Sequence, residues 1–263
     1  MIVRGPAPGY AEVAAVVNAR AAALKRIYAF ATLHVWYLDE DGDEEEEQFE
    51  VRIMLDQPER VFMRFQLATV ELAVLGSDEK EYWWINLRDE RRAWLGTHVR
   101  ATPELVARFA LPVHPQDFVL LMGMTGIPAE QGDATVAWSA DGHELVVETG
   151  ARLGRRRTML APTEGGYDPV RIELLDDRGR VTVSADLAKY EWQRLTRGEP
   201  MQRMAKEIHF DLAANGARGR LRPQYDGRQM VKDRAFDRGR LFKAYKIGPE
   251  DVELLDEMEG RGG

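Results

Sequence analysis

The side chains of this chain with the strongest potential for chemistry do not stand in a recognised catalytic pattern. Ser77 and Lys80 match the Ser-x-x-Lys order of the penicillin-binding class, but its SDN and KTG elements are missing and the pair falls in an expected turn. The five histidines lack metal-ligand spacing, and there is no cysteine to supply a thiolate. We therefore expect no enzymatic activity, no cofactor and no metal site.

An acidic run between Asp39 and Glu47 is open to two interpretations. Asp39, Asp41 and Asp43 could supply carboxylates to a calcium loop, which needs oxygen ligands at fixed offsets and a glycine at its sixth position. Gly42 comes too early for that geometry. The run fits the tip of a hairpin better, and we favour a solvated turn.

The composition predicts one folded domain over residues 1–263. Hydrophobic residues make up 44% of the chain and charged residues 30%, which is typical of a globular protein. No apolar run approaches the roughly 18 residues needed to cross a bilayer. The net charge of −8 argues against nucleic acid as a partner. Residues 1–9 read as an irregular lead-in and residues 248–263 as an acidic tail.

Hydrophobic periodicity predicts a mainly β fold with a few helices. An Ala-rich helix starts at Ala11 and is expected to end at Lys25 and Arg26, after which the period changes to two. About six strands follow, then two short helices and about six more strands. The strand connections are too short for parallel crossovers, so we expect antiparallel pairing. The two central helices are expected at Pro103–Phe109 and Gln116–Met124.

Apolar side chains share one face of two neighbouring expected strands. Phe49, Val51 and Ile53 alternate along the first strand, and Val61, Met63 and Phe65 along the second. Aromatic residues are common in β cores, so a packed core is one interpretation. An apolar cavity is the other, and methionines suit an adaptable pocket. The candidates for lining it are Trp36, Phe49, Val51, Ile53, Val61, Met63, Phe65, Trp84, Phe118 and Leu121.

The C-terminal third carries a basic strip. Residues 194–246 hold 14 Lys and Arg against 6 Asp and Glu, and Arg218, Arg220 and Arg222 alternate on one expected strand face. A solvated or edge strand guarded by charge is one interpretation. Contact with an anionic membrane surface or an acidic partner is the other.

Several short segments resemble the LolA/LolB family of lipoprotein carriers. Leu75–Gly96 is similar to the family's DG-x-x-x-W-x-Y strand pair, with Trp84 near the tryptophan position. Gln57–Gln66 is similar to its P-x-x-x-R strand, with Arg64 as the arginine, and Ala235-Phe236 matches a late phenylalanine. The opening helix followed by a strand also fits.

This resemblance implies an incomplete antiparallel β-barrel, or strongly curved sheet, covered by the N-terminal helix and the two central helices. It further implies a non-enzymatic protein that holds a lipid, acyl chain or acylated lipoprotein in an apolar cavity. The family works in the periplasm or at the outer membrane, so a leader removed from this chain is expected. A regulatory or scaffold protein of the same fold, acting through a protein partner, is the alternative.

Overall fold

The fold is described by a computed structural model that covers residues 5–39, 41–88, 90–106, 108, 113–213 and 215–257. Four helices and fourteen strands lie within these ranges, with short 3-10 turns between some of them. In chain order they are α1 (Tyr10–Ala22), β1 (Arg26–Leu38), β2 (Glu44–Asp56), β3 (Arg60–Leu67), β4 (Val70–Ser77), β5 (Glu81–Asn86), β6 (Arg92–Thr97), α2 (Pro103–Val106), α3 (Pro115–Leu121), β7 (Thr135–Trp138), β8 (Leu145–Ala151), β9 (Gly154–Thr163), β10 (Gly166–Leu175), β11 (Val181–Gln193), β12 (Gln202–Leu212), β13 (Arg218–Tyr225), α4 (Arg238–Tyr245) and β14 (Val252–Leu254).

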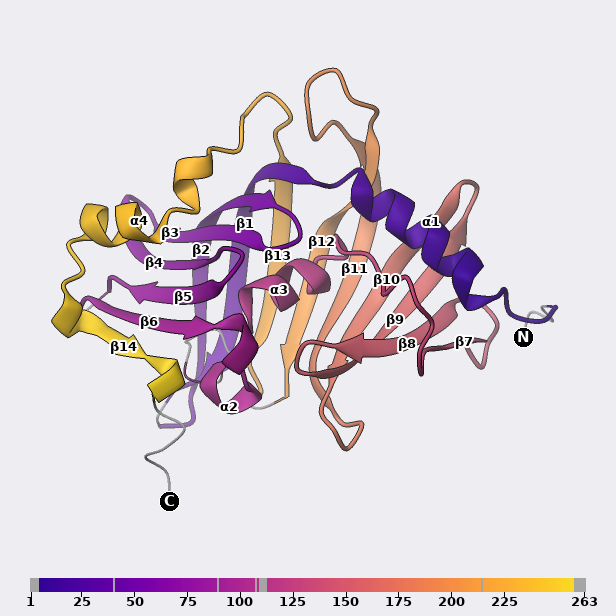
Figure 1. The fold of residues 1–263 in the computed structure, drawn as a ribbon, viewed down its shortest axis with the longest axis horizontal. Coiled ribbons are helices and arrows are strands. Elements are labelled where there is room, and N and C mark those ends of the chain that lie inside the picture. The colour runs from indigo at the N-terminus through magenta and orange to yellow at the C-terminus, as the bar shows by residue number, and fades with distance from the viewer. Residues whose placement is uncertain are drawn as a thin grey trace.

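The fourteen described strands form one sheet built from two meanders (Figure 1). The order is β14-β6-β5-β4-β3-β2-β1-β13-β12-β11-β10-β9-β8-β7. Each meander pairs consecutive strands antiparallel, as short connections require. The meanders join where β1 pairs with β13, with Leu33 opposite Leu221. The described edge strands are β14 and β7, so the sheet is open. It is neither closed nor strongly curled, which differs from the incomplete barrel or strongly curved sheet that the resemblance implied.

The inner face of the sheet carries the main core. Register places Ile53 opposite Met63 and Val51 opposite Phe65, so alternate side chains of β2 and β3 meet on this face. Leu75 of β4 and Trp84 of β5 extend the same apolar surface. The two predicted strand faces therefore lie side by side.

Short helices cover this inner face. In Figure 1, α3 lies in front of the middle of the sheet and α1 crosses its β8–β11 side. Helix α3 contacts β3, β4 and β10, and α1 contacts β10. Tyr10, Val13 and Ala14 of α1 pack with apolar residues of β8 and β9 in a smaller cluster.

The outer face of the first meander is also buried. Met54, Phe62 and Trp83 point to this side and pack against Phe236 and Leu241 from the C-terminal segment. Helix α4 starts at Asp237, whose side chain accepts a hydrogen bond from the Arg240 amide. The first meander is therefore sandwiched between two apolar layers.

The predicted mainly antiparallel sheet with an N-terminal helix and two short central helices is confirmed. Helix α1 ends at Ala22 rather than at Arg26, because the chain is already extended from Arg26 onward. Helix α4 and strand β14, which pairs parallel with β6, were not expected. Strand β14 lies within the expected acidic tail. Phe109 of the first predicted central helix, residues 1–4 of the lead-in and residues 258–263 of the tail lie outside the described residues.

Candidate functional site

Most of the predicted cavity residues come together on the inner face. Trp84 lies 5.7 Å from Phe65 between ring centroids, and Phe118 lies 5.2 Å from Phe210. Phe49 is half-buried at the margin of this cluster. Eight candidates are buried within it: Val51, Ile53, Val61, Met63, Phe65, Trp84, Phe118 and Leu121.

Trp36 is the candidate that the structure places elsewhere. Leu33 and Val35 of β1 face inward, so alternation along the strand sends Trp36 to the outer face. Its ring stacks on His34 at 5.8 Å, and the Arg220 guanidinium lies 5.5 Å from its centroid. Trp36 therefore belongs to the outer surface that also carries the basic strip.

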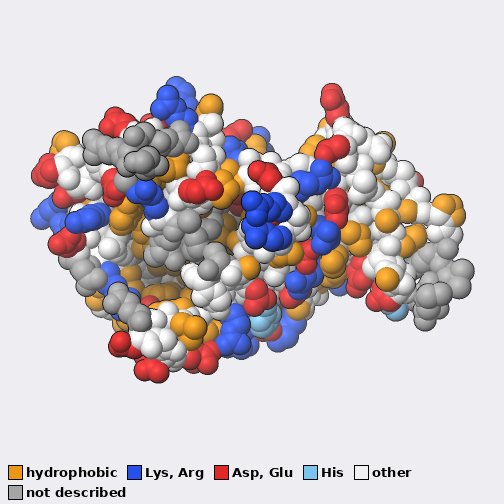
Figure 2. Space-filling model, turned by 90° about the horizontal axis from the view of Figure 1, so that it is seen from below, with side chains coloured by type: hydrophobic (Ala, Val, Ile, Leu, Met, Phe, Trp, Pro, Cys, Tyr) orange, Lys and Arg blue, Asp and Glu red, His pale blue; other side chains and the backbone are white. Residues whose placement is uncertain are grey.

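A small cover closes the inner-face cluster. Helix α3 buries six of its seven residues, and Met122 and Met124 follow it into the same cluster. Helix α2 adds Leu105 and Val106. Figure 2 shows the left half of the molecule hollowed from below, with hydrophobic side chains within the hollow. The inner face thus forms a continuous apolar surface under two helices of four and seven residues.

A chain of hydrogen bonds fixes the start of α3. The Gln116 amide donates to His114 Nδ1 at 3.2 Å, so this nitrogen is unprotonated and His114 Nε2 carries the proton. His114 Nε2 then donates to His98 Nδ1 at 3.2 Å, and His98 Nε2 donates to the Asp78 carbonyl at 2.7 Å. The cover is thereby tied to the turn between β4 and β5 through two neutral imidazoles.

The electrostatics of α3 follow from its burial. Burial lowers the pKa of His114 to about 2, and the nearby charge of Arg152 acts in the same direction. Burial also lowers the pKa of His98. Asp117 shows the opposite effect, since burial raises the pKa of its carboxyl to about 6 against the pull of Arg152 and Arg156.

The inner face is apolar. Its lining consists of aliphatic, aromatic and thioether side chains. Among the described residues, no group of three or more His, Asp or Glu could hold a metal ion. Within the same ranges, no helix is long and apolar enough to span a membrane.

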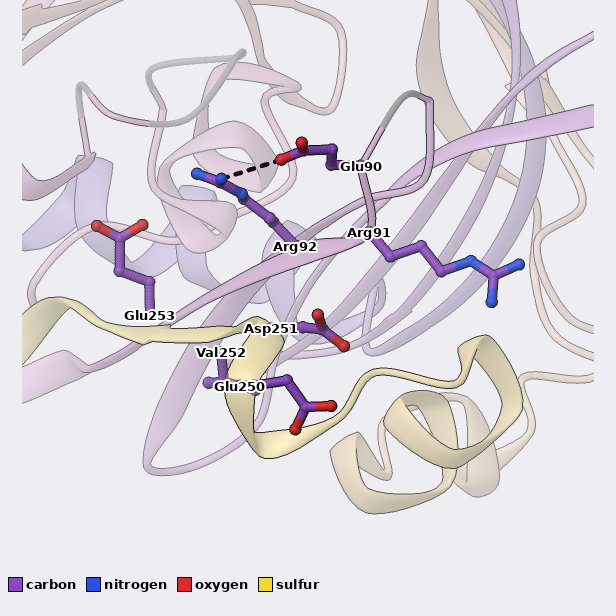
Figure 3. Close-up of a pocket in the computed structure, with 7 residues that line it drawn as sticks. All are labelled: Glu90, Arg91, Arg92, Glu250, Asp251, Val252 and Glu253. Carbon is purple, nitrogen blue, oxygen red and sulfur yellow. Dashed lines mark ion pairs between the residues drawn. The ribbon is translucent and has the colours of Figure 1, made fainter.

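The open depressions of the surface differ from this apolar site. One of about 620 Å³ lies where β6 meets β14, and Figure 3 shows charged side chains of both signs around it. Arg92 pairs there with Glu90 at 2.9 Å, while Glu250 and Glu253 line the β14 side. A lining this polar offers nothing to an acyl chain.

The basic strip lies on the outer face, and its charge is partly offset. Arg218 pairs with Glu44, and Arg222 Nε lies 3.1 Å from Glu207. Hydrogen bonds from His209, Lys189 and Arg222 lower the pKa of Glu207 to about 2. The strip is therefore part of a mixed-charge network rather than a purely basic surface.

Sequence reasoning missed the groups that hold the cover in place. His98 and His114 are sixteen residues apart and share no motif, so only the fold brings their rings together. Asp117 lies next to an apolar run of the sequence, which gave no signal that this carboxyl contributes to the cover. The one available signal was the His114-Pro115 pair, since proline is favoured in the first turn of a helix.

Comparisons with known proteins bear on the fold. No family model matches the sequence, and no curated protein matches it. Among solved structures, a LolA superfamily protein from Nitrosomonas europaea is 13% identical, with a TM-score of 0.53 over 85% of this chain and 97% of the other. A putative outer membrane lipoprotein-sorting protein domain from Vibrio parahaemolyticus is 13% identical, with a TM-score of 0.57 over 88% and 97%.

A DUF1329 family protein from Desulfovibrio piger is similar to the same extent. It is 11% identical, with a TM-score of 0.55 over 89% of this chain and 100% of the other. At such identities the likeness concerns the path of the backbone and not the chemistry of a site. The chain therefore has the fold of the LolA superfamily and of outer-membrane lipoprotein-sorting protein domains.

Proposed function

We propose that this chain is a non-enzymatic protein of the cell envelope that binds the acyl chain of a lipid or lipoprotein against the inner face of its sheet. The observation that carries the proposal is the continuous apolar surface beneath α2 and α3. Among the described residues, the eleven helical residues of α2 and α3 and the turns around them lie over this surface.

The driving force would be apolar burial. Each methylene removed from water contributes about 0.8 kcal/mol, so a chain of ten or more carbons can offset the cost of displacing a small cover. Met63, Met122 and Met124 are buried in this cluster, and unbranched thioether side chains repack at low cost. Phe118 and Leu121 would move outward with α3 to make room.

The fold supports the carrier role and the location. A LolA superfamily protein and a putative outer membrane lipoprotein-sorting protein domain share this architecture over most of both chains. An acylated lipoprotein is accordingly the proposed ligand, and the periplasm or outer membrane the proposed site of action.

A pair of matched ligands tests this proposal directly. A synthetic lipopeptide and the same peptide without its acyl chains are titrated into the purified protein by calorimetry. We expect saturable one-to-one binding of the acylated form at micromolar Kd, roughly −8 kcal/mol, and no binding of the other. Equal binding of the two peptides would assign recognition to the peptide and favour a partner-binding protein. Binding of neither would refute the carrier role.

Ligand carried through purification gives a second readout. Organic extracts of the native protein are examined by mass spectrometry, beside extracts of a heat-denatured and refolded sample. We expect acyl-containing species in the first and their depletion in the second.

A further inference from the structure

A small, partly enclosed cavity lies beside the proposed acyl site, between α1, α3 and the segment after it, and strands β9 and β10. Its volume is about 20 Å³, enough for one particle the size of a water molecule or slightly larger. Apolar side chains such as Val17, Leu160 and Ile172 form part of the wall. The polar side chains of its lining are Arg20, Thr125, Arg156, Thr158 and Tyr167.

Arg156 brings a buried positive charge to this cavity. It is only 6% exposed, and burial lowers its pKa to about 10. Its hydrogen-bond partners are the Thr149 hydroxyl at 2.9 Å, the Gly126 carbonyl at 2.8 Å and, weakly, the Thr125 hydroxyl at 3.5 Å. All three are neutral, so within the described residues this guanidinium has no direct ion pair. The carboxyl of Asp117 acts on it electrostatically and raises the pKa of Arg156, against the larger effect of burial. A buried charge without a direct ion-pair partner is costly.

Arg20 adds a second guanidinium to the same cavity. It donates to the Gly123 carbonyl at 2.6 Å and to the Arg203 carbonyl at 3.2 Å, which are again neutral groups. Its Nε is buried without a hydrogen-bond partner among the described residues. Two guanidiniums and two threonine hydroxyls therefore surround this space, and no carboxylate is among the described residues that line it.

We propose that this cavity binds one small inorganic anion of the size of chloride, held between Arg20 and Arg156. A water molecule would satisfy some of the donors but would bring no negative charge to the two guanidiniums. An anion would satisfy the donors and balance the charge, and apolar walls would strengthen the attraction. Because Arg20 lies on α1 and Arg156 on β9, the anion would tie the N-terminal helix to the sheet.

Thermal melting at constant ionic strength tests the proposal, with sodium bromide exchanged stepwise for sodium gluconate, whose anion is too large for the cavity. We expect Tm to rise by a few degrees with bromide and then level off, since a ligand that binds only the folded state stabilises it. Arg156→Gln should abolish the dependence. Arg157→Gln is the matched control, because Arg157 instead pairs with Glu148 and Glu173, and it should retain the dependence.

Two results of the melting experiment would contradict the proposal. Equal Tm in bromide and gluconate, or the same rise in Arg156→Gln as in the native protein, would overturn the proposal and leave a water site with a general salt effect. If Arg156→Gln fails to fold, Arg20→Gln takes its place. Anomalous diffraction from bromide-soaked crystals of the native protein decides independently of any variant: a peak in the cavity supports the site, and its absence overturns it.

Discussion

At the scale of single residues, His114 serves as a hydrogen-bonding cap that must stay neutral. Its Nδ1 accepts from the Gln116 amide, and protonation would remove that acceptor. We expect His114→Asn, which keeps an N-cap acceptor, to preserve most of the stability. His114→Leu should cost about 1 kcal/mol. Urea denaturation at pH 7.5 measures both variants, and equal losses would contradict a capping role.

The pH dependence of stability gives a second test of His114. Its pKa is about 2 in the folded protein and about 6.5 when unfolded. The unfolded chain therefore binds more protons between these values, and the free energy of unfolding should fall as pH drops below about 6.5. His114→Asn should flatten that fall when the two proteins are compared by denaturation at several pH values. An unchanged slope would show that other groups dominate.

Asp117 should act with the opposite sign. Burial raises its folded pKa to about 6 from 3.8, so the free energy of unfolding should fall as pH rises through this window. Above it, the ionised carboxyl remains unfavourable in the folded protein. Asp117→Asn should therefore stabilise the protein at pH 7.5 by on the order of 2 kcal/mol and have little effect near pH 4. The exposed Glu104→Gln is the control, expected within about 0.5 kcal/mol at both pH values. A loss of stability in Asp117→Asn at pH 7.5 would refute this assignment.

The adjacent residues Trp83 and Trp84 show how far the orientation of a side chain can be predicted from the sequence. Trp84 was correctly placed on a β-strand but stood beside Trp83, and alternation alone could not say which one faces the core. Both are buried, Trp84 beneath the cover and Trp83 beneath the C-terminal segment. Burial on both faces removes the usual polar alternation, and it depends on a segment about 150 residues away.

At the scale of elements, the cover over the inner face is expected to open without global unfolding. Because the chain has no cysteine, Met63→Cys places a single thiol beneath α3. We expect its labelling by a thiol reagent to report an opening free energy well below that of global unfolding, as local openings do. Val99→Cys, at a 95% exposed position, is the control and should label at the rate of a free thiol. Labelling of Met63→Cys that tracks global unfolding would rule out a separately opening cover.

Contact of the basic strip on β13 with an anionic membrane is a prediction. Arg218 and Arg222 already pair with Glu44 and Glu207, so contact with an anionic membrane has to compete with these pairs. Binding to acidic vesicles, measured by co-sedimentation, should be weak, weaken further with salt and disappear when Arg218, Arg220 and Arg222 are all changed to Gln. Unchanged binding in the triple variant would show that these arginines do not contact the membrane and would favour a solvated strand.

Helix α4 and strand β14 were not predicted because each is short and lies within a stretch rich in charged residues. The helix Arg238–Tyr245 reads as part of a basic stretch, and Val252–Leu254 as part of an acidic one. Each is ordered by what it packs on: Leu241 against the outer face, and Leu255 beside β14 in the main cluster. Tertiary contacts here outweigh local propensity.

At the scale of the whole molecule, period-two alternation in Phe49–Leu55 and Val61–Phe65 was sufficient to predict the antiparallel meander. The pairing of β1 with β13 was beyond reach, because contacts between strands some 190 residues apart leave no local pattern. The same limit applies to the site. The apolar strand face could be predicted, but the helix and the histidine pair that close it depend on the assembled sheet.

The most direct test of the central claim compares two methionine-to-tryptophan variants. Met63→Trp places an indole beneath the cover, and Met54→Trp places one on the adjacent strand beneath the C-terminal segment. Each is melted and titrated with a fluorescent acyl probe. If α2 and α3 form a displaceable cover, Met63→Trp should block the probe at little cost in stability. Met54→Trp should lose about 1–3 kcal/mol by overpacking and still bind the probe. A native protein that never binds the probe, with Met63→Trp destabilised as strongly as Met54→Trp, would contradict the account.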